Sequence, residues 1–360
     1  MGPQPALRAW TAFVNCEVRV KRFFSPSTPG PRLRPYACLR AAPRSRKLYQ
    51  TCPEYLKSCT ARWVTVLGSS MTEQKISDTL RVVAPGKVVL FGEYAVLTGA
   101  PAAVMAVNAY ASVEVSQSQD SNWHFSSAGF NCEPSRHAGN ELPKDASAGF
   151  TATTLEHWGY RSLKDSALEP TQVRTDTAAF FHRGNKLGLG SSAAACTATY
   201  VALAQRLQRQ ATVREALDIH RNWQGGKGSG LDVASCWSGG VIRFQNAAAA
   251  VLPWPQKLGW QVVWSGTSAA TTDHIAHFDE WRRQADLKPL RRLSELSNDL
   301  CNTPNLTLLG AYQRALMDLD KAAELKIFSA EHEELVKIAT AFGLVYKPCG
   351  AGGGDIGIAF

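Results

Sequence analysis

A glycine loop that runs directly into an alanine-rich helix is the feature that most constrains the fold of this chain. The stretch KLGLGSSAAACTATYVALA spans 186–204, where Gly188 and Gly190 bracket one residue before Ser191 and Ser192 open the predicted helix. Such a junction points several backbone N–H groups at one place, and the helix dipole adds partial positive charge there. The pattern favours an anion site, although an ordinary capped helix after a glycine turn would have the same sequence pattern. The serine hydroxyls could cap the helix or bind Mg²⁺ or phosphate.

Two further glycine-rich stretches could also carry chemistry. In PCGAGGGDIGIAF (348–360), glycines crowd the positions before Asp355, which predicts either close approach to a ligand or a tight turn. In GGKGSGLDVASCWSGG (225–240), Asp232 follows a flexible loop. This carboxylate could accept a proton from a substrate hydroxyl and pair with a lysine, or it could simply cap the following segment.

The remaining pattern predicts segregated strands and helices, so the fold class is α+β. We expect strands at 81–97 (two runs around a Pro-Gly break), 101–115, 239–244 and 260–266, and on both sides of the glycine loop within 343–360. We expect helices at 191–208 and 212–224 and over most of 273–298 and 306–340, whereas 117–150 indicates loops with short strands.

The basic character of the chain lies entirely in its first 70 residues. The whole sequence has 39 basic and 30 acidic residues; residues 1–70 hold twelve of the former and two of the latter, together with eight of the eighteen prolines. The other 290 residues are nearly neutral, which argues against a core that binds nucleic acid. The leader resembles an organelle transit peptide. The alternative is that Met71 is the true start and the leader is not part of the working protein.

Cysteine usage and hydropathy indicate the setting of the protein. The nine cysteines are scattered without CxxC or Cys/His ligand spacing, which argues against a zinc site and fits a reducing compartment. No run of 18 apolar residues occurs, so we expect no transmembrane helix and no membrane partner. We expect a cytoplasmic protein, or an organelle protein if the leader is a transit peptide.

The three glycine-bearing stretches, together with APGKVVLFGEYAVL (84–97), resemble the GHMP kinase superfamily. Each signature stands in the family's order, and the resemblance covers about residues 80–360. It implies a GHMP kinase fold with an N-terminal domain like ribosomal protein S5 domain 2, a ferredoxin-like C-terminal domain, and the active site between them. The implied organisation is a disordered basic leader at 1–75, the N-terminal ATP-binding domain at 76–258 and the C-terminal domain at 259–360.

Within the superfamily, the details are similar to the phosphomevalonate kinase branch. Tyr94 stands where mevalonate kinases usually have His, Lys186 directly precedes the central loop, and Asp355 ends the last one. GSGLDVA (228–234) and WSGTSAATTD (264–273) are also similar to that branch. The resemblance implies ATP-dependent phosphorylation of (R)-5-phosphomevalonate to the 5-diphosphate, in the mevalonate route to isoprenoids. The acceptor would be a phosphate group and the cofactors ATP and Mg²⁺, in a monomer or homodimer.

The resemblance also assigns site residues. Catalytic roles fall to Lys87 and Lys186, which would neutralise phosphoryl charge, and to Asp232, near the acceptor phosphate or a lysine. The residues that would wrap the ATP phosphates are Gly188, Leu189, Gly190, Ser191, Ser192 and Ala193, with Ser191 or Ser192 also on Mg²⁺. The residues that would shape the substrate pocket are Glu93, Tyr94, Ser229, Gly230, Gly350, Ala351, Gly352, Gly353 and Asp355.

Two departures and three alternatives remain open. The chain ends five residues after Asp355, so we expect a truncated C-terminal domain with an exposed strand edge, and Cys349 stands where Ser is common. A mevalonate kinase or another GHMP small-molecule kinase is the near alternative. The alternatives of other classes are a non-catalytic sensor or regulator with this fold and a nucleic-acid binder that acts through the leader.

Overall fold

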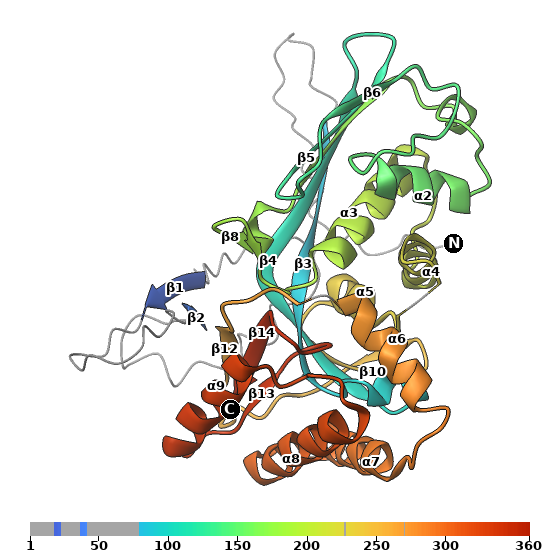
Figure 1. Ribbon diagram of the computed structural model, residues 1–360. Coiled ribbons are helices and arrows are strands. Elements are labelled where there is room, and N and C mark those ends of the chain that lie inside the picture. The colour runs from blue at the N-terminus through green and yellow to red at the C-terminus, as the bar shows by residue number, and fades with distance from the viewer. Residues whose placement is uncertain (1–17, 23–36, 42–78, 227, 270) are drawn as a thin grey trace, which may run out of the picture.

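The computed structural model describes residues 18–22, 37–41, 79–226, 228–269 and 271–360. Figure 1 shows a long twisted sheet with helices along one face, next to a smaller sheet and a group of C-terminal helices. This arrangement confirms the predicted α+β class. Within residues 1–78 the structure describes two strands, β1 (Val18–Arg22) and β2 (Ala37–Ala41); the rest of the predicted leader lies outside the described residues.

Two long antiparallel strands form the spine of the larger sheet. Strand β3 (Leu80–Phe91) pairs with one edge of β4 (Ala102–Gln117), whose other edge pairs first with β10 (Val241–Gln245) and then with β7 (Thr171–Asp176). The sheet continues through β5 (Trp123–Ala128) and β6 (Ser135–His137) on one side and β11 (Ala248–Val251) on the other.

The Pro-Gly break predicted within 81–97 does not divide β3. Instead the pairing with β4 shifts register between Pro85 and Gly86. The loop that contains Leu189 lies against this irregularity: its carbonyl accepts the Lys87 amide at 2.8 Å, and a Cβ built on Gly86 would lie 2.7 Å from the same oxygen. A glycine here therefore allows the loop to approach the strand, which places Lys87 beside the loop.

Helix α3 (Ser191–Arg206) is the central helix on this sheet. Almost all of it is buried, and its alanines leave room for close packing against β3 and β4 and between neighbouring helices (Figure 1). The other helices of this layer are α2 (Gly149–His157), α4 (Val213–Trp223) and α5 (Leu231–Ser238). The predicted helices at 191–208 and 212–224 are confirmed as α3 and α4, whereas α2, α5, β7 and β11 were not predicted as separate elements.

The smaller sheet has the order β1-β2-β12-β14-β13, with β12 at Gln261–Trp264, β13 at Tyr346–Pro348 and β14 at Ile356–Ala359. The last strand pairs on both sides, with β12 and β13, so the edge expected to be exposed is not at β14. The boundary predicted between 258 and 259 lies between strands of the two sheets and stays a prediction. The C-terminal helices are α6 (Thr271–Trp281), α7 (Lys288–Asn302), α8 (Leu306–Ala323) and α9 (Ala330–Ala341).

Short elements complete the chain between these layers. The 3₁₀ turns are η2 (Ala95–Thr98), η3 (Lys164–Ser166) and η4 (Ala178–Phe180), and β8 (Phe181–His182) and β9 (Asn185–Lys186) form a small hairpin before α3. Among the described residues, no helix has both the length and the apolar character needed to span a bilayer.

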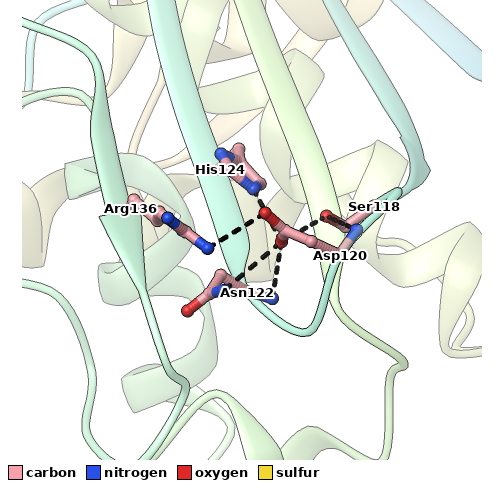
Figure 2. A network of polar contacts seen from close by, with 5 residues as sticks. All are labelled: Ser118, Asp120, Asn122, His124 and Arg136. Atoms are coloured by element: carbon pink, nitrogen blue, oxygen red, sulfur yellow. Dashed lines mark hydrogen bonds and ion pairs between the residues drawn. The ribbon is translucent and has the colours of Figure 1, made fainter.

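An exposed polar network stabilises the turn between β4 and β5 (Figure 2). Asp120 accepts hydrogen bonds from the Asn122 amide at 2.8 Å and from Arg136 at 3.1 Å, and its carboxylate lies 2.9 Å from His124 Nε2. The contact with His124 holds the pKa of Asp120 well below its usual value. Asp120 and Asn122 lie in this turn, His124 in β5 and Arg136 in β6, so the network stabilises this part of the sheet locally.

Candidate active site

A cleft of about 520 Å³ brings the three glycine-bearing stretches together. Its walls come from β3 and the turn after it, the loops before α3 and α5, and the loop between β13 and β14. Fourteen of the residues predicted from the sequence line it: Lys87, Glu93, Tyr94, Lys186, Gly188, Gly190, Ser192, Ser229, Gly230, Asp232, Gly350, Ala351, Gly352 and Asp355.

The loop before α3 has the backbone shape that the anion-site prediction requires. Gly188 and Gly190 adopt left-handed φ values of 76° and 82°, and Gly190 is the N-cap of α3. The first amides of a helix have no partner within it, so this end of α3 offers N–H donors and positive potential to the cleft. Ser192 lines the cleft, whereas Ser191 is buried and its Oγ has no hydrogen-bond partner in the structure.

Lys87 and Asp232 form an ion pair on the floor of the cleft. Lys87 lies in β3 directly after the register shift and is 8% exposed. Its Nζ lies 3.3 Å from Oδ2 of Asp232, which is in the first turn of α5. Burial lowers the pKa of Lys87, but the Asp232 carboxylate raises it further, so the net pKa lies above the ordinary value. The ammonium group is therefore charged at neutral pH and positioned between the carboxylate and the α3 loop.

Asp355 also lines the cleft. It ends the glycine loop of the small sheet, and its Oδ1 accepts the Ala269 amide at 3.1 Å. The two glycine loops touch here, because a Cβ built on Gly188 would lie 2.5 Å from Asp355 Cβ. Burial raises the pKa of Asp355, which Lys186 and Lys87 partly offset by favouring the charged form. Lys186 itself is exposed at the rim.

The contact between the two glycine loops predicts a steric effect at Gly188. Alanine there would displace Asp355. We therefore expect Gly188→Ala to lower kcat/KM of the expected kinase reaction by about 100-fold, because small misplacements in an active site have effects of that size. The matched control is Gly184→Ala: Gly184 has φ of 78°, nearly that of Gly188, but no atom within 4 Å of its added Cβ. Both variants carry similar backbone strain, so equal activities in a steady-state assay would contradict the steric argument.

Glu93 has structural partners that the sequence did not reveal. Its Oε1 pairs with Lys347 Nζ from β13, and its Oε2 accepts the Tyr312 hydroxyl of α8 at 2.8 Å. Its side chain is almost completely buried. The carboxylate therefore ties the end of β3 to the C-terminal elements, while its predicted contact with substrate stays a prediction.

Tyr94 makes a second tie across the cleft. Its hydroxyl donates to the carbonyl of Ala351 at 2.6 Å, and its ring packs 5.0 Å from that of Phe278 in α6. The backbone at Tyr94 is in the left-handed region, with φ of 59°. Strain of this kind persists where the surroundings hold it in place, and here it aims the side chain at the glycine loop.

Four predicted residues do not line the cleft. Leu189 and Ala193 are buried in the core beneath the α3 loop, and Ser191 is buried beside them. Gly353 points its amide away, to the carbonyl of Ile327 at 2.9 Å. The roles in ligand binding that the sequence predicts for these four residues stay predictions.

Several cleft residues were not predicted, and three of them come from the end of α4. His220, Trp223 and Gln224 line the cleft with Phe130 and Cys349. The ring of His220 is stacked on that of Trp223, and its Nε2 lies 3.5 Å from Ser192 Oγ. The signal was available, because IHRNWQ (219–224) directly precedes the glycine stretch at 225–230.

His220 gives the fold a predictable response to acid. It is 4% exposed, and burial lowers its pKa to about 4, against the opposing effect of Asp232. The unfolded chain binds this proton near pH 6.5, whereas the folded chain binds it only near pH 4. The contribution of neutral His220 to the free energy of unfolding is therefore complete above pH 6.5. It is lost as pH falls towards 4, by about 3 kcal/mol in total. We expect His220→Gln to flatten the unfolding free energy between pH 4 and 6.5 in urea titrations. A curve parallel to that of the wild type would contradict this assignment.

The chain is similar in sequence and fold to several known proteins. A model of the GHMP kinases N terminal domain matches residues 176–240. The phosphomevalonate kinase of Streptomyces sp. (strain CL190) is 28% identical over 344 residues, which cover 77% of this chain and 88% of that protein. The Lin0012 protein from Listeria innocua has a TM-score of 0.67 at 26% identity, covering 79% of this chain and 90% of that one.

A further solved structure shares the fold. The Streptococcus pneumoniae phosphomevalonate kinase, in complex with phosphomevalonate and AMPPNP, has a TM-score of 0.57 at 18% identity and covers 78% of this chain and 91% of its own. The structure therefore has the predicted GHMP kinase fold, with a match to the GHMP kinases N terminal domain at 176–240, and the relatives support a small-molecule kinase.

Proposed function

We propose that this kinase transfers the γ-phosphoryl group of ATP to the phosphate of (R)-5-phosphomevalonate. An acceptor phosphate oxygen bonds to the γ-phosphorus as the bond to the β,γ-bridging oxygen breaks, which gives 5-diphosphomevalonate and ADP. The observation that carries the proposal is the position of Lys87, between the α3 loop and Asp232. The Streptomyces relative, named a phosphomevalonate kinase, supports the choice of acceptor.

The chemistry of this acceptor fits the cleft. A phosphate monoester is largely ionised at neutral pH, so its oxygen needs no strong base. The harder task is to bring two polyanions together, which calls for cations and N–H donors in fixed positions. Lys87, Lys186 and the N-terminus of α3 supply such groups. Asp232 is paired with Lys87, so its role here is to hold the ammonium group rather than to remove a proton.

Mg²⁺ is part of the proposal, and Ser192 is the better placed of the two predicted serines to hold it. Hydroxyl oxygens suit this hard cation, and Ser192 lines the cleft, whereas Ser191 is buried outside its lining. The described residues contain no cluster of three His, Cys, Asp or Glu side chains that could hold a metal ion. The protein would therefore contribute few ligands and the nucleotide phosphates several. When bound, the ion would neutralise charge on the transferring group.

A test of the acceptor measures ADP release with ATP and each of phosphomevalonate, mevalonate, galactose and homoserine. We expect kcat/KM for phosphomevalonate to exceed that for mevalonate by about 100-fold or more, since a site built for a charged group rejects the analogue that lacks it. If the protein phosphorylated mevalonate but not phosphomevalonate, it would instead be a mevalonate kinase, with Asp232 as the base. Lys186→Met is the matched loss-of-charge variant, and a full rate in it would count against a role for Lys186.

A further inference from the structure

A buried histidine lies directly behind the glycine loop of the cleft. His332 on α9 is completely buried, with Nδ1 2.7 Å from the Tyr346 hydroxyl and Nε2 3.0 Å from the carbonyl oxygen of Gly354. A carbonyl oxygen can only accept, so Nε2 carries the proton and Nδ1 accepts from the tyrosine. The ring therefore joins β13 to the residue immediately before Asp355.

The loop in front of this histidine needs anchors. Gly350, Gly352 and Gly353 have left-handed φ values of 72°, 76° and 74°, and Asp355 itself has φ of 57°. Such a conformation is unfavourable for Asp and gives the glycines many alternatives, so the loop has one shape only where neighbours fix it. The contact from His332 to Gly354 is one of the buried hydrogen bonds that do so.

We propose that His332 is a positioning residue, whose Nε2–H bond to Gly354 holds the glycine loop so that Asp355 lies against the α3 loop. The functional part of this inference rests on the proposed kinase function. Burial lowers the pKa of His332, and Lys347 lowers it further, whereas Gly354 and Glu331 oppose this. The neutral ring with one donor and one acceptor suits both partners.

Two substitutions separate the two nitrogens of the ring. The amide nitrogen of Gln reaches about as far as Nε2, whereas that of Asn reaches only as far as Nδ1. We expect His332→Gln to keep the Gly354 bond and His332→Asn to lose it. His332→Leu is a second disruptive variant of similar volume, should the Asn variant not fold. Tyr346→Phe is the matched control, since it removes the Nδ1 partner and leaves the Gly354 bond in place.

Hydrogen exchange of the 350–355 amides, followed by mass spectrometry on the full chain, reports loop position without substrate. We expect exchange to be roughly tenfold faster in His332→Asn and His332→Leu than in wild type, and near wild type in His332→Gln and Tyr346→Phe. In the kinase assay, kcat should fall about 100-fold in the two disruptive variants, while KM for ATP changes by less than about threefold.

The outcomes divide cleanly. The assignment is supported if His332→Gln keeps slow exchange of the 350–355 amides and a normal kcat, while His332→Asn and His332→Leu lose both. Equal behaviour of the Gln variant and the disruptive variants, or greater loss in the Gln variant, would overturn it and leave His332 a packing residue. If no acceptor is phosphorylated, the proposed function fails, but the exchange pattern still decides whether His332 holds the loop.

Discussion

Replacing Lys87 by methionine is expected to lower kcat/KM by about 1,000-fold, at the upper end of what one fixed electrostatic group contributes. Methionine keeps the aliphatic volume against Gly190, whose built Cβ would lie 2.9 Å from Lys87 Cε. It removes the charge that faces the cleft, and it leaves Asp232 as an uncompensated anion beside the proposed phosphate site. The loss therefore has two parts, missing attraction and new repulsion.

The two parts can be separated. In the double variant Lys87→Met/Asp232→Asn the repulsion is gone, so we expect activity to recover about tenfold from the single variant, because contacting residues act non-additively. Lys337→Met, on the outer face of α9, removes an exposed lysine and should leave kcat/KM unchanged. Steady-state kinetics with thermal melts would check this. A Lys87→Met enzyme within tenfold of wild type would contradict the electrostatic role.

Local features of the sequence predicted local structure well. The start of α3 at Ser191 follows from two glycines, two serines and an alanine run, since helix nucleation and capping depend on neighbouring residues. Helix α5 was missed because its eight residues lie between glycine-rich turns, too short for a clear period. Strand β7 was missed although TQVRTD alternates buried and exposed side chains throughout.

Contacts between distant segments could not be predicted in the same way. The order of the glycine stretches indicated one site through the family resemblance, but nothing in the residues showed that Gly188 touches Asp355. Glu93 shows the same limit. The family resemblance implied a substrate contact, while its partner Lys347 lies 254 positions away. A side chain's role depends on such partners, which only the folded chain brings into contact.

The Glu93–Lys347 pair carries the prediction with the largest effect on stability. Lys347 is fully buried, and its Nζ also donates to the Pro348 carbonyl at 2.8 Å. Lys347→Met would leave the Glu93 carboxylate buried without its cation, which costs about 3–5 kcal/mol. For a chain of this size we expect the melting temperature to fall by about 10 °C.

The reason for this cost can be tested in the same position. Tyr312 donates to Glu93 and accepts the Gly92 amide at 2.8 Å, so a neutral amide at position 93 would keep a partner. We therefore expect Glu93→Gln/Lys347→Met to be more stable than Lys347→Met alone, because it removes the unpaired charge rather than the packing. Thermal and urea unfolding followed by circular dichroism would measure both variants. If the double variant were less stable than the single one, packing of the lysine stem would explain the loss, and the buried pair would not be what joins β3 to β13.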